Sequence, residues 1–540
     1  MQKVIVIGID GATPDLIEPW MNDGKLPNLD KIRKRGTWGK LASTIPPFSA
    51  PAWTTIVTGC NPGKHSIYGF ETTDTVETHL ITSSYRKVPA LWNYLTNIGL
   101  KSIIVNVPGT YPPEKINGVM ITGLLTPSEE SNFTYPKNIK GKLTEDELGD
   151  YELEQLWIED FPRSYMAKHA PDKLLQRILR QMESRAKVTT NLMKKFDWDF
   201  TMVVFRGTDT AQHFLFDKKD LLLSCYQKVD QLVGEMIKTF TDAVFIIVSD
   251  HGFESIKKVL CPDNVLYNAN LLWPIRDQYN SPISIIWNLT FKIWNQVLRL
   301  MPTNTIKRSS FIRMLLFSGS SKDKLIDFSK TRAFSTAEGR GIQIALKDRY
   351  GEGIVDSKEY DKLCKEISVI FKDLKDPDTG KKIVEEVYQW DEVYGKQAID
   401  PPDLILKLEK GFASTEGIRG PDGLSSILQS KGEIIPYIFK NDPAGRSGDH
   451  APYGVIFAYG NSIKPGHVVK NISVGDILPI VFAAMGIPIP NSIDGKLFND
   501  VFIEKPTVKI VDWKSYLSNK QILSEGELKK INEIRNMFKH

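Results

Sequence analysis

Six short apolar runs set the strongest limit on how this chain can fold. The first, KVIVIGID at Lys3 to Asp10, is rich in β-branched residues and leads directly into a glycine. Such runs are typical of parallel strands that are covered on both faces of a sheet. The other five runs are SIIVNV at 102–107, GVMITG at 118–123, FTMVVF at 200–205, AVFIIVSD at 243–250 and GVIFAYG at 454–460.

Helical patterns separate several of these runs. Residues 26–36 begin with a leucine and a proline and end in glycine, which is typical of a short helix, and 172–195 and 221–240 predict two longer helices. Strands that alternate with helices indicate an α/β fold. We therefore expect a mainly parallel central sheet flanked by helices.

Two segments break this alternation. Residues 264–321 are rich in Trp, Ile, Leu, Lys and Arg and predict a helical insertion, and 322–412 contain a strand–helix–strand pattern that predicts a small α+β subdomain. The last apolar run follows both segments. The core is therefore expected to be discontinuous and to comprise residues 1–263 and 413–540.

Composition excludes several classes of protein. The 540 residues include 69 basic and 65 acidic side chains, a net charge of +4 that is too small to indicate nucleic acid as a stable partner. Four cysteines without a CxxC pair argue against a disulfide scaffold or a thiolate zinc site. We find no apolar run of ~18 residues that predicts a membrane span. The N-terminus leads directly into a strand, so we expect no signal peptide and a cytoplasmic protein.

Carboxylates follow three of the predicted strands. Asp10 and Asp250 end their strands, and Asp209 follows the strand at 200–205. In open α/β sheets, ligands bind at the carboxyl ends of the strands. We therefore expect these three side chains to meet at one edge of the sheet.

Histidines accompany the carboxylates. His251 follows Asp250 directly, His213 lies four residues after Asp209 on the same face of a helical turn, and His450 precedes the last strand. Carboxylate oxygens and imidazole nitrogens without thiolates suit Zn²⁺, with Mn²⁺ as the alternative. Six such groups are too many for one tetrahedral ion and indicate two sites. A two-metal site stabilises both oxygens of an in-line phosphoryl displacement.

The stretch FSAPAWTTIVTG at 48–59 supplies a hydroxyl in an unusual setting. Ser49 lies on a turn that Pro51 interrupts, just before an apolar run that is expected to be a helix. A core has little use for this hydroxyl. A hydroxyl bound to a metal has a lowered pKa and becomes a nucleophile.

At this point the sequence resembles a known family. Residues 8–71, from GIDGATPD to SIYGFE, resemble the opening of the alkaline phosphatase superfamily, and in particular its type I phosphodiesterase/nucleotide pyrophosphatase branch with the prokaryotic phosphohydrolase and phosphomutase relatives. DTAQH at 209–213, VSDHGF at 248–253 and the histidine before GVIFAYG are similar to the later signatures of that branch.

The resemblance implies a role for each residue. One divalent ion would be held by Asp10, Asp250 and His251, with Ser49 as the nucleophile that bridges toward it. The second would be held by Asp209, His213 and His450. The implied activity is hydrolysis of small-molecule phosphate esters, with diesters favoured. Phosphotransfer, phosphomutase activity or monoester hydrolysis on a lipid or glycan head group is the alternative. A non-catalytic interaction protein is disfavoured, because all seven positions hold competent residues.

The sequence also departs from the family. Nucleotide pyrophosphatases carry a phosphate-binding Asn near the position of Phe70, so nucleotide specificity is in doubt. The candidates for the missing donor are Lys64, His65, Arg206 and Arg446. Cys60 in CNPGK resembles the sulfatase CxPxR signature, but it lacks the arginine and lies eleven residues past Ser49. We expect Cys60 to be structural.

The predicted insertion contains an apolar stretch at 283–301 that is followed by basic residues up to Arg313. One interpretation is an amphipathic lid on the catalytic core. The other is a peripheral contact between 283–313 and a membrane or lipid surface. The oligomeric state stays open.

Overall fold

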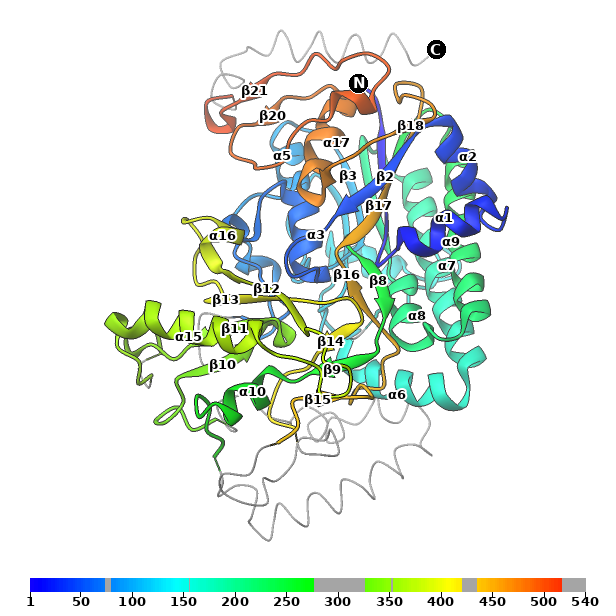
Figure 1. Ribbon diagram of the computed structural model, residues 1–540. Coiled ribbons are helices and arrows are strands. Elements are labelled where there is room, and N and C mark those ends of the chain that lie inside the picture. Colours follow the sequence, from blue (N-terminus) through cyan, green and yellow to red (C-terminus); the bar gives the residue numbers. More distant parts are fainter. Residues whose placement is uncertain (73–78, 155, 276–325, 351–352, 420–434, 517–540) are drawn as a thin grey trace, which may run out of the picture.

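The computed structural model describes residues 1–72, 79–154, 156–275, 326–350, 353–419 and 435–516 (Figure 1). Most of the predicted insertion, including all of the proposed membrane contact at 283–313, lies outside these residues. Among the described residues, no helix has the length and apolar character that crossing a membrane requires.

One large sheet forms the centre of the molecule. Its strands lie in the order β18-β2-β17-β7-β1-β6-β3-β4-β5, and β19 also pairs with β2. The five neighbours from β7 to β4 are parallel, which confirms the predicted α/β fold with a mainly parallel sheet. The strands are β1 Val4–Ile9, β2 Thr37–Ala42, β3 Ser102–Val107, β4 Gly118–Thr122, β5 Thr134–Tyr135, β6 Phe200–Phe205, β7 Val244–Val248, β17 Tyr453–Tyr459, β18 His467–Val468 and β19 Ile472–Ser473.

Both faces of this sheet are covered, as continuous apolar strands require. In β1, Ile5, Ile7 and Ile9 pack into one hydrophobic cluster, whereas Val4 and Val6 pack into a second one. The first cluster includes residues of α1 Pro14–Asn22, α2 Pro27–Arg35, α7 Pro171–Lys195, α8 Gly207–Leu215 and α9 Lys219–Thr239. The second includes residues of α3 Ser49–Thr58, α5 Leu91–Asn97 and α17 Ile477–Met485.

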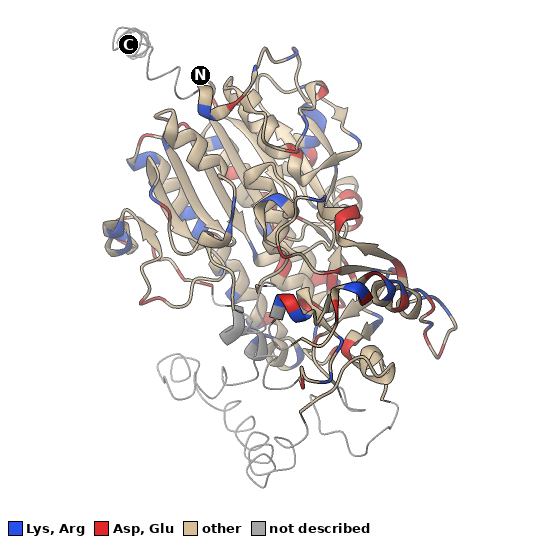
Figure 2. Ribbon diagram, turned by 90° about the vertical axis from the view of Figure 1, so that its left-hand side faces the viewer, with Lys and Arg blue, Asp and Glu red and all other residues tan. Residues whose placement is uncertain are grey.

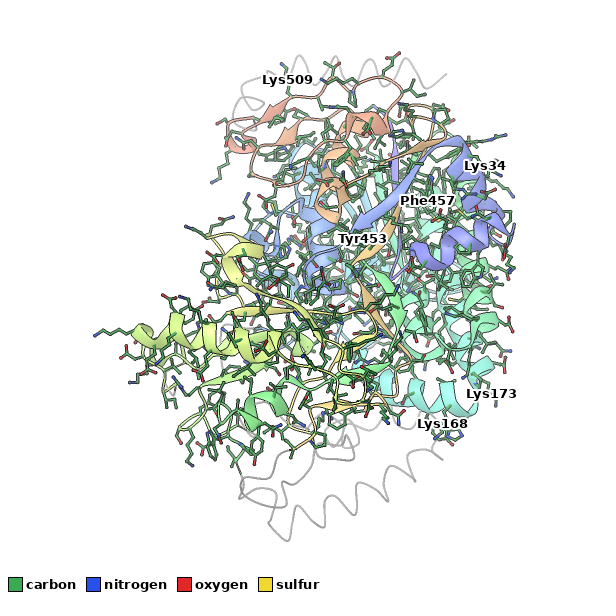
Figure 3. All side chains as sticks on the ribbon, viewed as in Figure 1. Lys34, Lys168, Lys173, Tyr453, Phe457 and Lys509 are labelled. Atoms are coloured by element: carbon green, nitrogen blue, oxygen red, sulfur yellow. The ribbon has the colours of Figure 1, made fainter. Side chains whose placement is uncertain are left out.

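β17 comes late in the sequence but lies inside the sheet, antiparallel to both β2 and β7. Phe457 on this strand is fully buried, whereas Tyr453 at its start is 53% exposed (Figure 3). The antiparallel orientation of β17, and the existence of β2, were not predicted. β2 reads TWGKLA and alternates between buried and less buried residues, because it lies near the edge of the sheet.

A second, antiparallel sheet lies in the region predicted as a subdomain. Its order is β10-β11-β13-β12, and α15 packs against it to form a separate hydrophobic cluster. Its elements are β10 Ala333–Thr336, β11 Gly341–Ile344, α14 Lys347–Tyr350, α15 Tyr360–Lys372, β12 Val384–Gln389, α16 Trp390–Tyr394 and β13 Leu404–Leu408. The boundaries at 263, 321 and 412 stay a prediction.

The chain also contains several shorter elements. They are α4 Pro62–His65, α6 Leu156–His169, β8 Gly252–Ser255, β9 Lys258–Leu260, α10 Pro262–Asn268, β14 Phe412–Ser414, β15 Ile438–Phe439, β16 Gly448–Ala451, β20 Ile489–Pro490 and β21 Ile510–Val511. β16 pairs with β8, and β8 begins shortly after β7 ends, so β16 lies near the C-terminal end of β7. Basic and acidic residues are interspersed over the ribbon in Figure 2, in line with the small net charge.

Candidate active site

Three neighbouring strands bring the three predicted carboxylates to one edge of the sheet. Asp10 follows β1, Asp250 follows β7 by two residues, and Asp209 is the third residue of α8, just after β6. Because β7, β1 and β6 are adjacent and parallel, their carboxyl ends coincide. All three aspartates are at most 1% exposed.

The first predicted ligand set is compact. His251 Nε2 lies 3.7 Å from Asp10 Oδ1 and 3.2 Å from Asp250 Oδ2. Ser49 Oγ lies 3.1 Å from the same nitrogen. The structure therefore places the hydroxyl and three potential ligands around one point.

The second predicted set is equally compact. Asp209 Oδ1 lies 3.4 Å from Nε2 of both His213 and His450, and these two nitrogens are 3.1 Å apart. Tetrahedral zinc with bonds of ~2.0–2.1 Å needs ligand atoms about 3.3–3.4 Å apart, which is close to these distances. The two sets adjoin, because the His251 and His450 rings have centroids 3.9 Å apart.

Backbone carbonyls orient two of the histidines. Nδ1 of His251 lies 3.0 Å from Gly252 O, and Nδ1 of His213 lies 3.1 Å from Gly448 O. A proton on Nδ1 that is donated to a carbonyl leaves Nε2 as the free nitrogen, which is how metal-ligating histidines are held.

The donor atoms themselves fit a cation. Asp10 Oδ1, Asp209 Oδ1 and Asp250 Oδ2 are buried without a hydrogen-bond partner, and each faces a histidine Nε2. Buried carboxylate oxygens normally have a partner. The orphaned oxygens and the absence of thiolates suit hard or borderline divalent ions.

Electrostatics support the same conclusion. Burial, together with the carboxylates of Asp250 and Asp209, raises the pKa of Asp10 well above its usual range. Burial also raises the pKa of Asp250 to about 7. Burial and the neighbouring His251 lower the pKa of His450 to about 3, so its imidazole is neutral, as a metal ligand must be. The crowded carboxylates would be relieved by a cation between them.

Ser49 lies at the start of helix α3 and not on a turn as the sequence suggested. Phe48 is the extended residue before the helix, and Pro51 lies in its first turn. Proline is tolerated there because the first N–H groups of a helix have no partner within it. The predicted helix behind Ser49 is confirmed, and Ser49 is 1% exposed.

Helix α3 and strand β1 fit together closely. A Cβ atom on Gly8 would lie 2.4 Å from Cη2 of Trp53, so only glycine allows this ring to lie against the strand. Trp53 Nε1 then donates to Asp10 Oδ2 at 3.1 Å. The tryptophan thereby links the helix that carries Ser49 to the first aspartate.

The four candidate phosphate donors all have other partners. Lys64 pairs with Asp494, and buried His65 contacts the Thr55 hydroxyl. Arg446 bonds to Asp442 and lies 3.4 Å from Asp449. Arg206 lies behind the ligands, where it bonds to Asp10 and Asp209.

Phe70 and Cys60 both lie in apolar surroundings. Phe70 packs against a small apolar cluster that includes Ala50 and Ile67, so it offers no polar contact to a phosphate. Cys60 follows the C-terminus of α3, is 2% exposed, and burial raises its pKa to about 11. The structural role of Cys60 and the doubt about nucleotide specificity at Phe70 stay predictions.

Two residues near the second set were missed. Asp449, which precedes His450, accepts a 2.7 Å bond from Arg340 of the antiparallel sheet region. The Arg340 guanidinium also lies over the ring of Phe48, 5.8 Å from its centroid. The only sequence signal was the position of Asp449 beside a predicted ligand, since Arg340 is 109 residues away.

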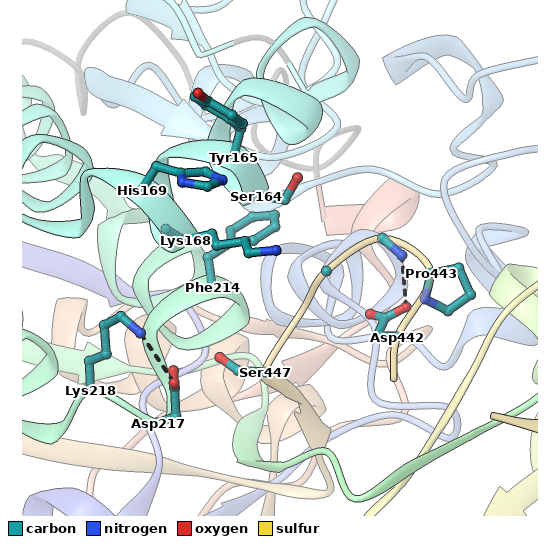
Figure 4. Close-up of a pocket in the computed structure, with 13 residues that line it drawn as sticks. Ser164, Tyr165, Lys168, His169, Phe214, Asp217, Lys218, Asp442, Pro443 and Ser447 are labelled. Carbon is teal, nitrogen blue, oxygen red and sulfur yellow. Dashed lines mark hydrogen bonds and ion pairs between the residues drawn. The ribbon is translucent and has the colours of Figure 1, made fainter. Parts of the chain in front are cut away.

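Figure 4 shows a cavity of about 610 Å³ that is lined in part by Phe214, the residue after His213. Ser447 lines it and donates its backbone N–H to His213 O at 2.6 Å. Lys168 from α6 points into it, while Lys218 pairs with Asp217 at its rim.

The fold and site define an α/β protein in which carboxylates, histidines and a hydroxyl cluster at one edge of the central sheet. A family model described as type I phosphodiesterase / nucleotide pyrophosphatase matches residues 4–433. The chain belongs to this family of the alkaline phosphatase superfamily, and it is a hydrolytic enzyme for phosphate esters.

Solved structures of ectonucleotide pyrophosphatase/phosphodiesterase 5 are similar to the chain. The human protein is 13% identical, with 93% of this chain and 100% of that chain covered at a TM-score of 0.46. The murine protein is 12% identical, with 90% and 95% covered, at a TM-score of 0.45 alone and 0.44 as an inactive variant in complex with AMP. No curated protein matched the chain.

Proposed function

We propose that the protein is a metal-dependent phosphodiesterase with Ser49 as its nucleophile. The observation that carries this proposal is the position of Ser49 Oγ, 3.1 Å from His251 Nε2 at the edge of the first ligand set. The second set adjoins the first, so a phosphate ester at Ser49 would lie beside both.

Two divalent ions fit the two sets. Asp10, Asp250 and His251 would hold one, and the other would be held by the second set of Asp209, His213 and His450. The donor types favour Zn²⁺, with Mn²⁺ as the alternative. When bound, such ions lower the pKa of a hydroxyl and stabilise charge on the attacking and leaving oxygens.

The chain's own residues supply attack and orientation. Ser49 Oγ releases its proton to water and forms a bond to phosphorus, while the bond from phosphorus to the departing alkoxide breaks. The alkoxide takes up a proton and leaves as an alcohol, and the serine then carries the rest of the substrate as a phosphodiester. Water then cleaves this ester and regenerates the hydroxyl. Because Ser49 is the first residue of α3, a phosphate ester bound there would lie at the helix N-terminus, where the helix dipole favours negative charge. Trp53 and the carbonyls of Gly252 and Gly448 fix the groups around this point.

A substrate panel tests the proposal. Protein treated with a chelator is reloaded with Zn²⁺ or Mn²⁺ and assayed on chromogenic phosphate diesters, monoesters, phosphonates and sulfates. We expect diesters to be hydrolysed fastest, and activity to vanish with the chelator and return with the metal. Monoester hydrolysis without diester hydrolysis would overturn the diester assignment.

The same assay separates hydrolysis from transfer. Products are measured with and without added alcohols of the lipid head-group or sugar type. A hydrolase gives the same phosphate product in both cases. If the phosphoryl group appears mainly on the added alcohol, the phosphotransferase or phosphomutase alternative replaces the proposal.

A further inference from the structure

Arg206 makes contacts that join the two ligand sets. Its Nε bonds to Asp10 Oδ2 at 3.3 Å, and its Nη2 bonds to Asp209 Oδ2 at 2.6 Å. Its third nitrogen, Nη1, bonds to Glu154 Oε1 at 3.0 Å. The guanidinium therefore has one carboxylate on each nitrogen, and the side chain is 4% exposed.

These bonds involve only the Oδ2 atom of each of the two aspartates. Oδ2 of Asp10 accepts from both Arg206 and Trp53, while its Oδ1 is free and faces His251. Oδ1 of Asp209 is likewise left to face His213 and His450. Arg206 thus fixes both carboxylates through Oδ2 and leaves the Oδ1 atom of each without a hydrogen-bond partner.

Charge explains why a cation is needed at this place. Asp10, Asp209 and Asp250 are buried together, and buried carboxylates are costly unless they are paired. Among the described residues, Arg206 is the arginine or lysine that forms ion pairs with two of these three aspartates. Glu154 in turn is surrounded by Arg163, Arg185 and Arg206, so the network continues away from the site.

We propose that Arg206 is a positioning residue and a resident counter-cation, which holds both ligand sets in place before any ion is bound. This inference rests on the metal sites of the proposed function. Two effects of removing Arg206 compete. Without Arg206 the ligands are less well oriented, which weakens ion binding about 10–100-fold. The buried carboxylates also lose their counter-charge, which destabilises the metal-free protein and so increases the stabilisation gained when ions bind. The second effect is larger, because two buried carboxylates lose a bonded guanidinium at once.

The test compares melting temperatures of the full chain with a chelator and with Zn²⁺ or Mn²⁺. For Arg206→Met we expect a large loss in the metal-free protein and a small loss in the loaded protein. The rise in melting temperature on adding ions should therefore exceed the parent's rise by at least ~3 °C. Arg206→Lys keeps the charge but loses the orienting hydrogen bonds, so only the loss of orientation remains and its rise should not exceed that of the parent.

Arg163→Met is the matched control. Arg163 is also buried and bonds to the same Glu154 Oε1 atom, whereas the ion pairs with Asp10 and Asp209 are made by Arg206. We expect it to lower both melting temperatures equally. An enlarged rise in Arg163→Met would assign the effect to Glu154 and overturn the proposal.

The other outcomes are equally decisive. A rise in Arg206→Met that equals or falls below the parent's rise contradicts the counter-cation role. So does an Arg206→Met protein that fails to fold even with ions, because the ions should supply the missing charge. If the parent itself binds no ions and shows no rise, the metal sites of the proposed function fail as well, and the two failures are distinguishable.

Discussion

The two ligand sets differ in how the fold holds them. Asp10, Asp250 and His251 follow adjacent parallel strands, and all three are fully buried. In the second set, His213 is 16% exposed, and His450 lies on the short strand β16 next to Asp449, which Arg340 holds from the region of the antiparallel sheet. The central sheet therefore positions the whole first set. In the second set it positions Asp209, whereas His450 depends on contacts with another region of the chain.

The largest expected effect concerns the hydroxyl of the first set. Ser49→Ala should lower turnover on a diester by on the order of 10³-fold or more, because only the ions and binding energy remain. The ion content, measured by elemental analysis, should stay at two per chain, because each ion keeps its Asp and His ligands.

Three further variants control this experiment. Ser49→Thr should retain substantial activity because it keeps a hydroxyl. Thr54→Ala and Thr55→Ala should be far milder, because these hydroxyls bond to Ala50 O and His65 within the helix packing. Full activity of Ser49→Ala would contradict the covalent mechanism and require direct attack by water.

Single ligand removal should separate the two sets. We expect His251→Ala and His213→Ala each to lose one ion of two, and each to lower turnover by about 10²-fold or more. Elemental analysis after dialysis against limiting metal measures the loss. If either substitution removes all bound metal, the sets form a single site and the comparison above is wrong.

Arg340→Met probes the weaker support of the second set. Losing the bond to Asp449 should loosen the segment that carries His450 and weaken one ion by about 10-fold, while the other ion keeps its affinity. Competition with a chromophoric chelator measures both affinities. Arg349→Met is the control, because Arg349 bonds to Asp403 in the same region, away from the ligands. Equal weakening of both ions would show that Arg340 does not act on the second set alone.

The smallest effect concerns a carboxylate near Arg340. Burial and the neighbouring Glu416 raise the pKa of Glu338 to about 8, with Arg446, Asp449 and Glu71 also nearby. An unfolded glutamate titrates near 4.5, so between these values the folded chain holds the extra proton. The stability contributed by Glu338 is therefore present at low pH and is lost as the pH rises toward 8.

Glu338→Gln should remove this pH dependence. The variant and the parent should melt at similar temperatures at pH 5, whereas at pH 8.5 the variant should melt a few degrees higher. Scanning calorimetry at the two pH values measures the difference. A variant that is less stable than the parent at pH 8.5 would mean that the ionised form of Glu338 is stabilised by its neighbours.

Local sequence patterns predicted the first set better than its surroundings. Continuous apolar runs that end in Asp10 and Asp250 predicted both the strands and the placement of the carboxylates. The spacing from Asp209 to His213 predicted a shared helical face, which α8 provides. The roles of these residues as ligands stay predictions.

Long-range contacts could not be predicted in the same way. The bond from Arg340 to Asp449 joins residues 109 positions apart, and Arg206 contacts Asp10 from 196 positions away. No periodicity encodes such pairs, because they depend on how separate elements pack. For the same reason, the sequence predicted Arg206 only as a candidate phosphate donor, whereas in the fold it bonds to Asp10 and Asp209.

The late position of β17 and β16 has a consequence for synthesis on the ribosome. The first ligand set is complete in the chain once His251 has been made, but His450 follows 199 residues later (450 − 251 = 199). At about 5–20 residues per second, this gap lasts roughly 10–40 s. During that time the nascent chain carries one full set of ligands and an unpaired edge on β7, which β17 covers only at the end. An ion that is captured early would thus meet half of the site before the other half exists.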